Sequence, residues 1–144
     1  MKVVYPVIFY EEKSGKYSVF VPDLDNCSTC GDDIADAMEM AEDLIAGEVL
    51  DSMEENNKIP HASKIEEVSF EKLENYLNIK NWDYVSKFKT YIAVDISAFA
   101  GKWGKELVKK TVNIPKWINI KAESEKINFS KTLEEALLEK IYKN

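Results

Sequence analysis

The 144-residue sequence predicts an α+β protein in two parts, a β-β-β-α-β domain over residues 1–98 and a β-α-α module over residues 108–144. Three observations predict this organisation. Apolar residues alternate at strand spacing at residues 17–21 and near residue 110, and they recur at helical spacing after residues 34 and 115. The two parts differ in charge. Residues 99–107 between them include two glycines and little periodicity, as expected of a linker.

The formal net charge of −7 is distributed unevenly along the chain. Residues 105–144 contain nine lysines and six acidic residues, whereas residues 1–104 contain ten lysines and twenty acidic residues, and arginine is absent. Such asymmetry indicates two parts with different partners. The basic part can bind phosphate groups, which would repel the acidic part. Since 45% of the residues are hydrophobic, a packed core is expected.

The chain up to residue 30 predicts three short strands. Residues 3–10 are rich in Val, Ile, Tyr and Phe, and the following residues 11–15 have the composition of a hairpin turn. Residues 17–21 alternate in polarity and predict the second strand. A third short strand is expected at residues 27–30.

A long helix is expected from Ile34 to Glu54, capped by an aspartate of Gly31-Asp32-Asp33. The apolar stripe expected to pack on the sheet is Ile34, Met38, Ala41, Ile45 and Val49. The other face is acidic and includes Asp36, Glu39, Asp43, Glu48 and Asp51. Such charge runs are usually solvated helix faces. No lysine occurs between Lys16 and Lys58, however, so an acidic docking surface is a competing interpretation.

Residues 56–98 are expected to complete the first domain. The composition predicts a loop at residues 56–63, a strand at residues 64–70 and a short helix at residues 71–77. The nearly continuous apolar run at residues 89–96 indicates a last strand in a central position of the sheet.

The C-terminal module is predicted to begin with a strand over residues 109–114, in which polar and apolar side chains alternate. Pro115 cannot continue a strand ladder but suits the first turn of a helix, which should end near Lys126. Ser130 is the expected N-cap of a second helix. Its apolar stripe is Leu133, Ala136, Leu137 and Ile141. Because so short a module cannot enclose a core alone, we expect a dimer in which two strands pair antiparallel.

This order of elements resembles the ribbon-helix-helix family of DNA-binding modules, in which a two-stranded ribbon enters the major groove. The resemblance implies that Lys109, Thr111 and Asn113 contact base edges, whereas Lys116 and Ser130 contact phosphates. The alternative is a small helical hairpin that only dimerises.

The N-terminal part resembles the N-terminal domain of HicB antitoxins. The resemblance is carried by Tyr5-Pro6, Pro22-Asp23-Leu24, Asn26-Cys27 and Gly31-Asp32. Asn26 stands where that family usually has glycine. The resemblance implies a partial RNase H-like fold for this domain. Longer HicB proteins often end in a ribbon-helix-helix module, so the resemblance covers nearly the whole chain.

The resemblance also implies a function. An antitoxin of this kind binds a small basic ribonuclease of HicA type and represses its own operon by binding operator DNA. The residues expected to bind the toxin are Asp36, Glu39, Asp43 and Asp51. The module would make the protein a homodimer, and the N-terminal domains could link two dimers into a tetramer. The alternative is a stand-alone ribbon-helix-helix repressor whose acidic domain binds a small ligand or only oligomerises.

Few residues could support catalysis. Cys27-x-x-Cys30 before a helix could be a redox pair or half of a zinc site. A zinc site needs further ligands, and the only histidine is His61. A redox pair needs the rest of a thioredoxin pattern, which does not surround the two cysteines. Two reduced thiols are therefore the favoured interpretation. A metal-dependent nuclease site would need carboxylates that hold two Mg²⁺ ions. The candidate carboxylates are Asp23, Asp25, Glu39 and Asp95, and their expected positions do not suit this arrangement. We expect no enzyme activity, cofactor or metal, and a cytoplasmic protein without a secretory signal or membrane span.

Overall fold

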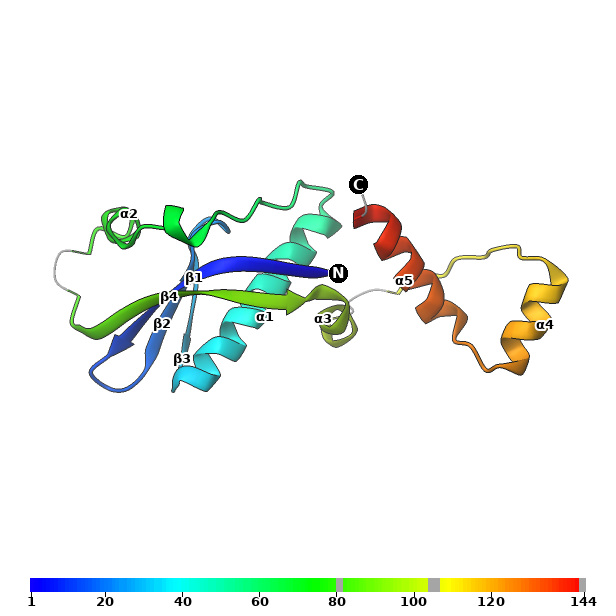
Figure 1. The fold of residues 1–144 in the computed structure, drawn as a ribbon, viewed down its shortest axis with the longest axis horizontal. Helices are drawn as coiled ribbons and strands as arrows, with labels where there is room; N and C mark the ends of the chain where they lie inside the picture. The colour runs from blue at the N-terminus through cyan, green and yellow to red at the C-terminus, as the bar shows by residue number, and fades with distance from the viewer. Residues whose placement is uncertain (80–81, 104–106, 143–144) are drawn as a thin grey trace.

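The computed structural model of the protein describes residues 1–79, 82–103 and 107–142. Its N-terminal part is a four-stranded antiparallel sheet in the order β3-β2-β1-β4 (Figure 1). The strands are β1 (Lys2–Glu12), β2 (Tyr17–Val21), β3 (Cys27–Gly31) and β4 (Tyr84–Asp95). The helices are α1 (Ile34–Glu54), the 3-10 helix η1 (Ile65–Glu67), α2 (Phe70–Tyr76), α3 (Ile96–Trp103), α4 (Lys116–Ser124) and α5 (Phe129–Tyr142). The α+β class is confirmed, whereas the RNase H-like arrangement stays a prediction.

β1 is the central strand, and both of its faces are covered. It pairs with β4 along its whole length and with β2 over residues 8–11. Tyr5 and Phe9 belong to the core that α1 closes, whereas Ile8 and Tyr10 belong to a second core beside α2. Because both faces are buried, β1 is a continuous apolar run and not an alternating one.

Pro6 is compatible with this central position because β2 does not extend alongside it. Glu12 donates its backbone N–H to the Lys16 carbonyl at 2.8 Å across the hairpin. By alternation, the even-numbered residues of β1 therefore direct their backbone groups toward β2. Pairing with β2 begins only at Ile8, so the missing N–H of Pro6 removes no ladder hydrogen bond.

α1 has the expected bounds and is capped by an aspartate, as expected. The Asp33 carboxylate accepts from the Asp36 N–H at 2.8 Å, and the Asp36 carboxylate accepts in turn from the Asp32 N–H at 2.8 Å. The expected apolar stripe is partly wrong, because Ile34 is exposed and Met38 only half-buried. The buried residues are Ala37, Ala41, Ile45, Ala46 and Val49. The first turn of α1 lies directly against Gly31, which places Ala37 at the sheet in place of Ile34.

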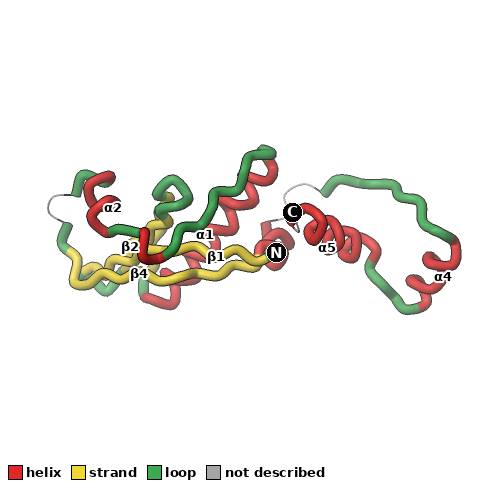
Figure 2. Tube along the Cα trace, turned by 45° about the horizontal axis from the view of Figure 1, so that its top comes forward, coloured by secondary structure: helices red, strands yellow, loops and turns green. Residues whose placement is uncertain are grey.

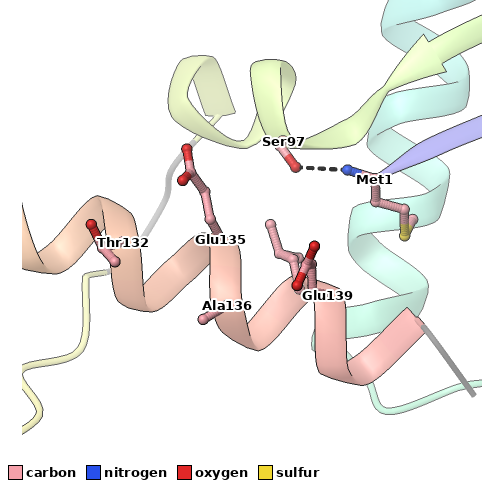
Figure 3. A pocket seen from close by; sticks show the side chains of 7 residues that line it. Met1, Ser97, Thr132, Glu135, Ala136 and Glu139 are labelled. Atoms are coloured by element: carbon pink, nitrogen blue, oxygen red, sulfur yellow. Dashed lines mark hydrogen bonds between the residues drawn. The ribbon is translucent and has the colours of Figure 1, made fainter.

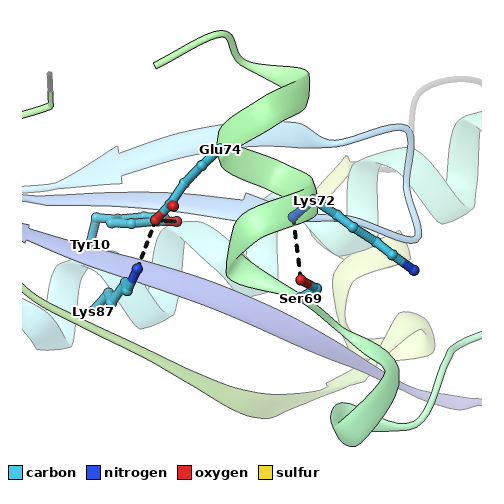
Figure 4. Close-up of polar contacts among 5 residues, drawn as sticks. All are labelled: Tyr10, Ser69, Lys72, Glu74 and Lys87. Atoms are coloured by element: carbon cyan, nitrogen blue, oxygen red, sulfur yellow. Dashed lines mark hydrogen bonds and ion pairs between the residues drawn. The ribbon is translucent and has the colours of Figure 1, made fainter. Parts of the chain in front are cut away.

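The strand expected at residues 64–70 is wrong, because η1 and the start of α2 occupy this stretch. Glu67 accepts from the Lys64 N–H at 3.0 Å, and Ser69 accepts from the Lys72 N–H at 3.3 Å (Figure 4). These side chains satisfy backbone donors at helix starts, which favours helix over strand in this stretch. The short helix expected at residues 71–77 is confirmed with a shift of one residue.

A polar contact holds α2 against its face of the sheet. Glu74 accepts from the Tyr10 hydroxyl at 3.0 Å and from the Lys87 ammonium at 2.8 Å (Figure 4). Lys87 lowers the pKa of Glu74, and Glu74 raises the pKa of Lys87. Beside this contact the rings of Tyr10 and Trp82 lie 4.5 Å apart between centroids. The small second core is therefore mainly aromatic.

β4 is longer than expected, and it lies at the edge of the sheet, so the central position predicted for it is wrong. Ile92 and Val94 are buried on the α1 side, whereas Tyr91 on the opposite face is exposed. The apolar run thus reflects one covered face and one partly open face. Length and composition alone do not distinguish such a strand from a central one.

A helix replaces most of the expected linker. Residues 96–103 form α3, in which Ile96 is buried and Phe99 packs against the main core. Asp95 accepts from the Ser97 N–H at 3.1 Å and so supports the start of α3. Burial of these two apolar side chains favours a helix despite Gly101. Residues 104–106 of the expected linker lie outside the described residues.

α4 and α5 lie beyond the end of the sheet at which β1 begins (Figures 1 and 2). α4 starts immediately after Pro115, which therefore occupies the N-cap position and not the first turn. At its other end Ile127 donates to the Ala122 carbonyl and Lys126 donates to the Glu123 carbonyl, both at 3.0 Å. This pattern, with Lys126 in the left-handed region at φ 55°, is a Schellman motif, and it confirms the expected end of the helix.

Two expectations for the module differ from the structure. Asn128, not Ser130, caps α5, because its side-chain oxygen accepts from the Lys131 N–H at 3.1 Å. Ser130 lies within the first turn. Residues 109–114 form no strand in the described chain, and Figure 2 shows the segment before α4 as a loop. A strand needs a hydrogen-bonding neighbour, and no described strand lies alongside this segment, so the ribbon stays a prediction.

We predict that Gly31→Ala lowers the free energy of unfolding by about 1–3 kcal/mol, because the new Cβ would overpack the contact between β3 and α1. That Cβ would lie 2.3 Å from the backbone nitrogen of Ala37. Gly47→Ala is the matched control, because a Cβ at Gly47 meets no atom within 4 Å. Alanine in mid-helix should stabilise by about 0.5–1 kcal/mol. Urea unfolding at one protein concentration measures both, and equal effects would contradict the role of Gly31.

Candidate functional site

The four carboxylates expected to bind a partner all lie on α1, but their surroundings differ. Glu39 and Asp51 are exposed, whereas Asp36 and Asp43 are half-buried. Asp36 already caps the helix through its hydrogen bond to the Asp32 N–H. The spacing of seven residues places Asp36 and Asp43 close to one line along the helix, and Asp51 lies further round it.

A groove of about 270 Å³ runs between this side of α1 and the edge strand β3. Its lining includes Thr29 from β3 and Met40, Leu44 and Gly47 from α1. Three carboxylates also line it, those of Asp43, Glu48 and Asp51. The structure thus brings Asp43 and Asp51 into one site, which Asp36 and Glu39 do not line. The site combines an apolar floor with an anionic rim.

Asp43 has an unusual environment within the groove. Its Oδ1 atom is shielded from solvent and has no hydrogen-bond partner among the described residues. A buried carboxylate oxygen without a donor is destabilising, by roughly 1–3 kcal/mol for a typical polar group. The groove therefore contains a partly buried carboxylate, whose negative charge adds to that of the rim.

The apolar part of this groove was not predicted from the sequence. Met40, Leu44 and Gly47 follow one another at helical spacing on the acidic side of α1, outside the buried stripe. A second stripe of this kind, together with a glycine in the middle of a helix, was the available signal. Thr29 could be placed only by the contact between β3 and α1.

The two cysteines do not form a redox pair or a metal site among the described residues. Both are free thiols. They are three positions apart on β3, and because side chains alternate along a strand, they lie on opposite faces of the sheet. Cys27 is half-buried on the α1 side, and burial together with the Glu48 carboxylate raises its pKa to about 11. Cys30 is exposed.

The carboxylates considered for a nuclease site have separate structural roles. Asp23 accepts from the N–H and the hydroxyl of Ser63, at 2.8 and 2.7 Å, and so anchors the loop after α1. Asp95 supports the start of α3. In the described ranges no group of three or more His, Cys, Asp or Glu side chains could hold a metal ion.

The turn that carries Asp25 accounts for the unusual residue at position 26. Asp25 and Asn26 both adopt left-handed backbone conformations, with φ of 52° and 56°. Asparagine tolerates this region better than most residues with a Cβ. Asn26 can therefore take the conformation for which glycine is the usual choice.

The residues expected to contact DNA are all exposed. Lys109, Thr111 and Asn113 lie in the segment before α4, and Lys116 is the first residue of that helix. Ser130 lies apart from them, at the start of α5. The single chain therefore does not bring the five residues into one surface.

A larger groove, of about 610 Å³, separates α5 from the N-terminal part (Figure 3). The Met1 nitrogen donates to the Ser97 hydroxyl at 2.9 Å on one side of it. Glu135, Ala136 and Glu139 of α5 line the other side. None of the expected site residues lines this groove.

No helix in the described chain is long and apolar enough to cross a membrane.

Two features are typical of a protein that acts by binding other macromolecules: a groove with an anionic rim on the α+β domain, and a separate module with exposed apolar side chains such as Trp117 and Leu137. A family described as the HicB-like antitoxin of bacterial toxin–antitoxin systems matches residues 5–143. The chain therefore belongs to the HicB-like antitoxin family, and it is an antitoxin of a toxin–antitoxin system.

Solved structures and a curated relative resemble this chain. A chain of a toxin–antitoxin complex from Streptococcus pneumoniae is 29% identical, with a TM-score of 0.62, over 97% of this chain and 99% of that one. The antitoxin HicB of Burkholderia pseudomallei is 19% identical, with a TM-score of 0.47, over 99% and 98% of the two chains. A 14.9 kDa protein from the rep-hol intergenic region of Haemophilus phage HP1 is 27% identical over 100 residues, which is 69% of this chain and 67% of the relative.

We predict that the two thiols differ in reactivity toward a disulfide reagent at pH 8. Cys30 should react quickly, whereas at a pKa of about 11 only roughly one thousandth of Cys27 is ionised at that pH. The expected time course has one fast and one slow phase of equal amplitude. Cys30→Ser should remove the fast phase alone. Two equal rates, or a spontaneous disulfide, would contradict the assignment.

Proposed function

We propose that this antitoxin neutralises a HicA-type ribonuclease by binding it through the groove and the acidic side of α1, and that its C-terminal module represses the operon as a DNA-binding dimer. The groove between α1 and β3, with its anionic rim, carries the first half of this proposal. All residues that line this groove belong to residues 17–57, which contain no lysine.

Electrostatics supports this choice of partner. A ribonuclease must bind the phosphates of RNA, so it presents a basic surface. Carboxylates on α1 complement that surface, speed the encounter and discriminate against acidic proteins. Apolar contacts then supply most of the lasting affinity. The groove offers both, because Met40 and Leu44 lie beside Asp43 and Asp51.

The exposed apolar side chains of the C-terminal module support the second half of the proposal. Val112, Ile114, Trp117, Leu137 and Ile141 are each more than 40% exposed in the single chain. Apolar side chains exposed in such number mark an interface. Pairing of residues 109–114 with the same segment of a second chain would satisfy their backbone groups and enclose these side chains between the two modules.

In such a dimer the ribbon would present the polar side chains of the segment to DNA. Lys109, Thr111 and Asn113 alternate with Val112 and Ile114, so the polar set would face the bases and the apolar set would face the helices. Lysine suits guanine, asparagine suits adenine, and threonine suits either. Lys116 and the start of α5 near Ser130 would contact phosphates.

The proposed binding of the toxin is tested by reversing charge on α1. Glu39→Lys with Asp51→Lys should slow association with the toxin by roughly tenfold or more at low salt, because the steering field is reduced. The loss should shrink as salt shortens the Debye length from about 30 Å at 0.01 M to about 3 Å at 1 M. Stopped-flow or surface-based kinetics measures both rates.

The matched control changes the same net charge on the opposite face of the sheet. Glu66 in η1 and Glu71 in α2 are exposed, and Glu66→Lys with Glu71→Lys should leave association nearly unchanged. Equal slowing by both pairs would mean that only net charge matters. Association indifferent to either pair would mean that the acidic side of α1 is solvated surface.

The proposed DNA binding is tested by substituting two residues, for which we expect different effects. Asn113→Ala should weaken binding to the operator by about 1–3 kcal/mol and relax its sequence specificity, because a base contact is lost. Lys116→Ala should weaken all sequences alike and reduce the slope of log K against log salt by about 0.9, because one phosphate contact is lost. Titrations of operator and scrambled DNA at several salt concentrations measure both. Wild-type affinity and specificity in Asn113→Ala would contradict the predicted strand register.

A further inference from the structure

The middle of α1 contains a glycine that the fold does not require. Gly47 lies within a 21-residue helix, and a Cβ built there meets no atom within 4 Å. Its backbone is in the helical region, so no left-handed conformation explains it. Glycine in a helix interior is destabilising by roughly 0.5–1 kcal/mol relative to alanine. Gly31 is the contrasting case, because a Cβ there would meet the backbone of α1.

The missing side chain of Gly47 leaves part of the groove unfilled. Leu44 and Met40 form an apolar floor one and two turns earlier in the helix, and Thr29 of β3 forms the opposite wall. At about 270 Å³ the groove is smaller than the roughly 300–1,000 Å³ of pockets for small organic ligands. It is open on one side, as a site for part of a protein partner must be.

The charges around the groove define the chemistry of the occupant. Asp43, Glu48 and Asp51 all line it, and no lysine does. Oδ1 of Asp43 is shielded from solvent and has no donor among the described residues. An apolar floor with an anionic rim suits a side chain with an aliphatic stem and a cationic end, which means lysine or arginine. Arginine has more donors than lysine, so it can serve Asp43 and a second carboxylate at once.

We propose that the groove at Gly47 is the socket for one cationic side chain of the toxin, with its stem on Met40 and Leu44 and its charge at Asp43. This inference rests on the proposed neutralisation of a basic ribonuclease, and it specifies the contact that makes the complex long-lived. The exposed carboxylates speed the encounter, whereas the socket slows dissociation. Filling the socket should therefore leave the association rate unchanged and increase the dissociation rate.

The test uses the whole 144-residue chain and, as its binding partner, a cognate HicA-type basic protein that carries a substitution abolishing ribonuclease activity. Gly47→Leu fills the socket without a change of charge, and leucine is a good helix former, so the fold is retained. We expect roughly tenfold or faster dissociation with nearly unchanged association. Gly47→Ala should have a much smaller effect. Asp43→Asn, which removes the charge beside the shielded oxygen, should also accelerate dissociation.

Ala35→Leu is the matched control. Ala35 is exposed on the first turn of α1 and does not line the groove, so the same gain in volume there should leave both rates unchanged. Thermal unfolding confirms that each variant is folded. If Gly47→Leu dissociates as slowly as wild type while Glu39→Lys with Asp51→Lys still slows association, the socket is wrong and the proposed function stands. If wild type does not bind the basic protein at all, both are wrong.

Discussion

The burial of β1 on both faces is the constraint on which the rest of the N-terminal part depends. A central strand with apolar side chains on each face needs two covering layers. α1 supplies one of them along most of the strand, and η1 with α2 supplies the other near Ile8 and Tyr10. The covering is unequal. Val4 and Tyr91 remain exposed on the α2 side, where the second layer ends.

Covering β1 also determines which side of α1 remains available for binding. The contact between Gly31 and Ala37 fixes the rotation of the helix at its first turn, and the buried stripe from Ala37 to Val49 follows from it. Met40, Asp43 and Gly47 then lie beside this stripe, on the flank of the helix next to the edge strand β3. A glycine at the end of a five-residue strand therefore decides the position of a groove about one to four turns further along the helix.

The sequence was sufficient for the parts of the structure that local rules govern. The bounds of β1, β2 and α1 follow from periodicity and from the aspartate cap, and the end of α4 follows from turn residues after Ser124.

The sequence was insufficient where tertiary contacts decide the structure. β4 has the composition of a central strand but lies at an edge, and α3 is helical because Ile96 and Phe99 reach the core. Ser130 and Asn128 are equally good caps by composition, and only the structure distinguishes them. In the candidate site, the carboxylates were visible in the sequence, but the apolar floor between them was not.

α1 departs from the rules of helix stability at several positions, and these departures coincide on one side and at one end. Gly47 weakens the helix interior, and the last turn contains no basic residue. Instead Asp51, Glu54 and Glu55 lie near the C-terminus of the helix, where the macrodipole disfavours negative charge by about 0.3–1 kcal/mol per group. The shielded oxygen of Asp43 adds a further unfavourable contribution. Local choices that oppose stability are expected at functional sites, and those at Gly47 and Asp43 support the proposal that the groove between α1 and β3 binds the partner.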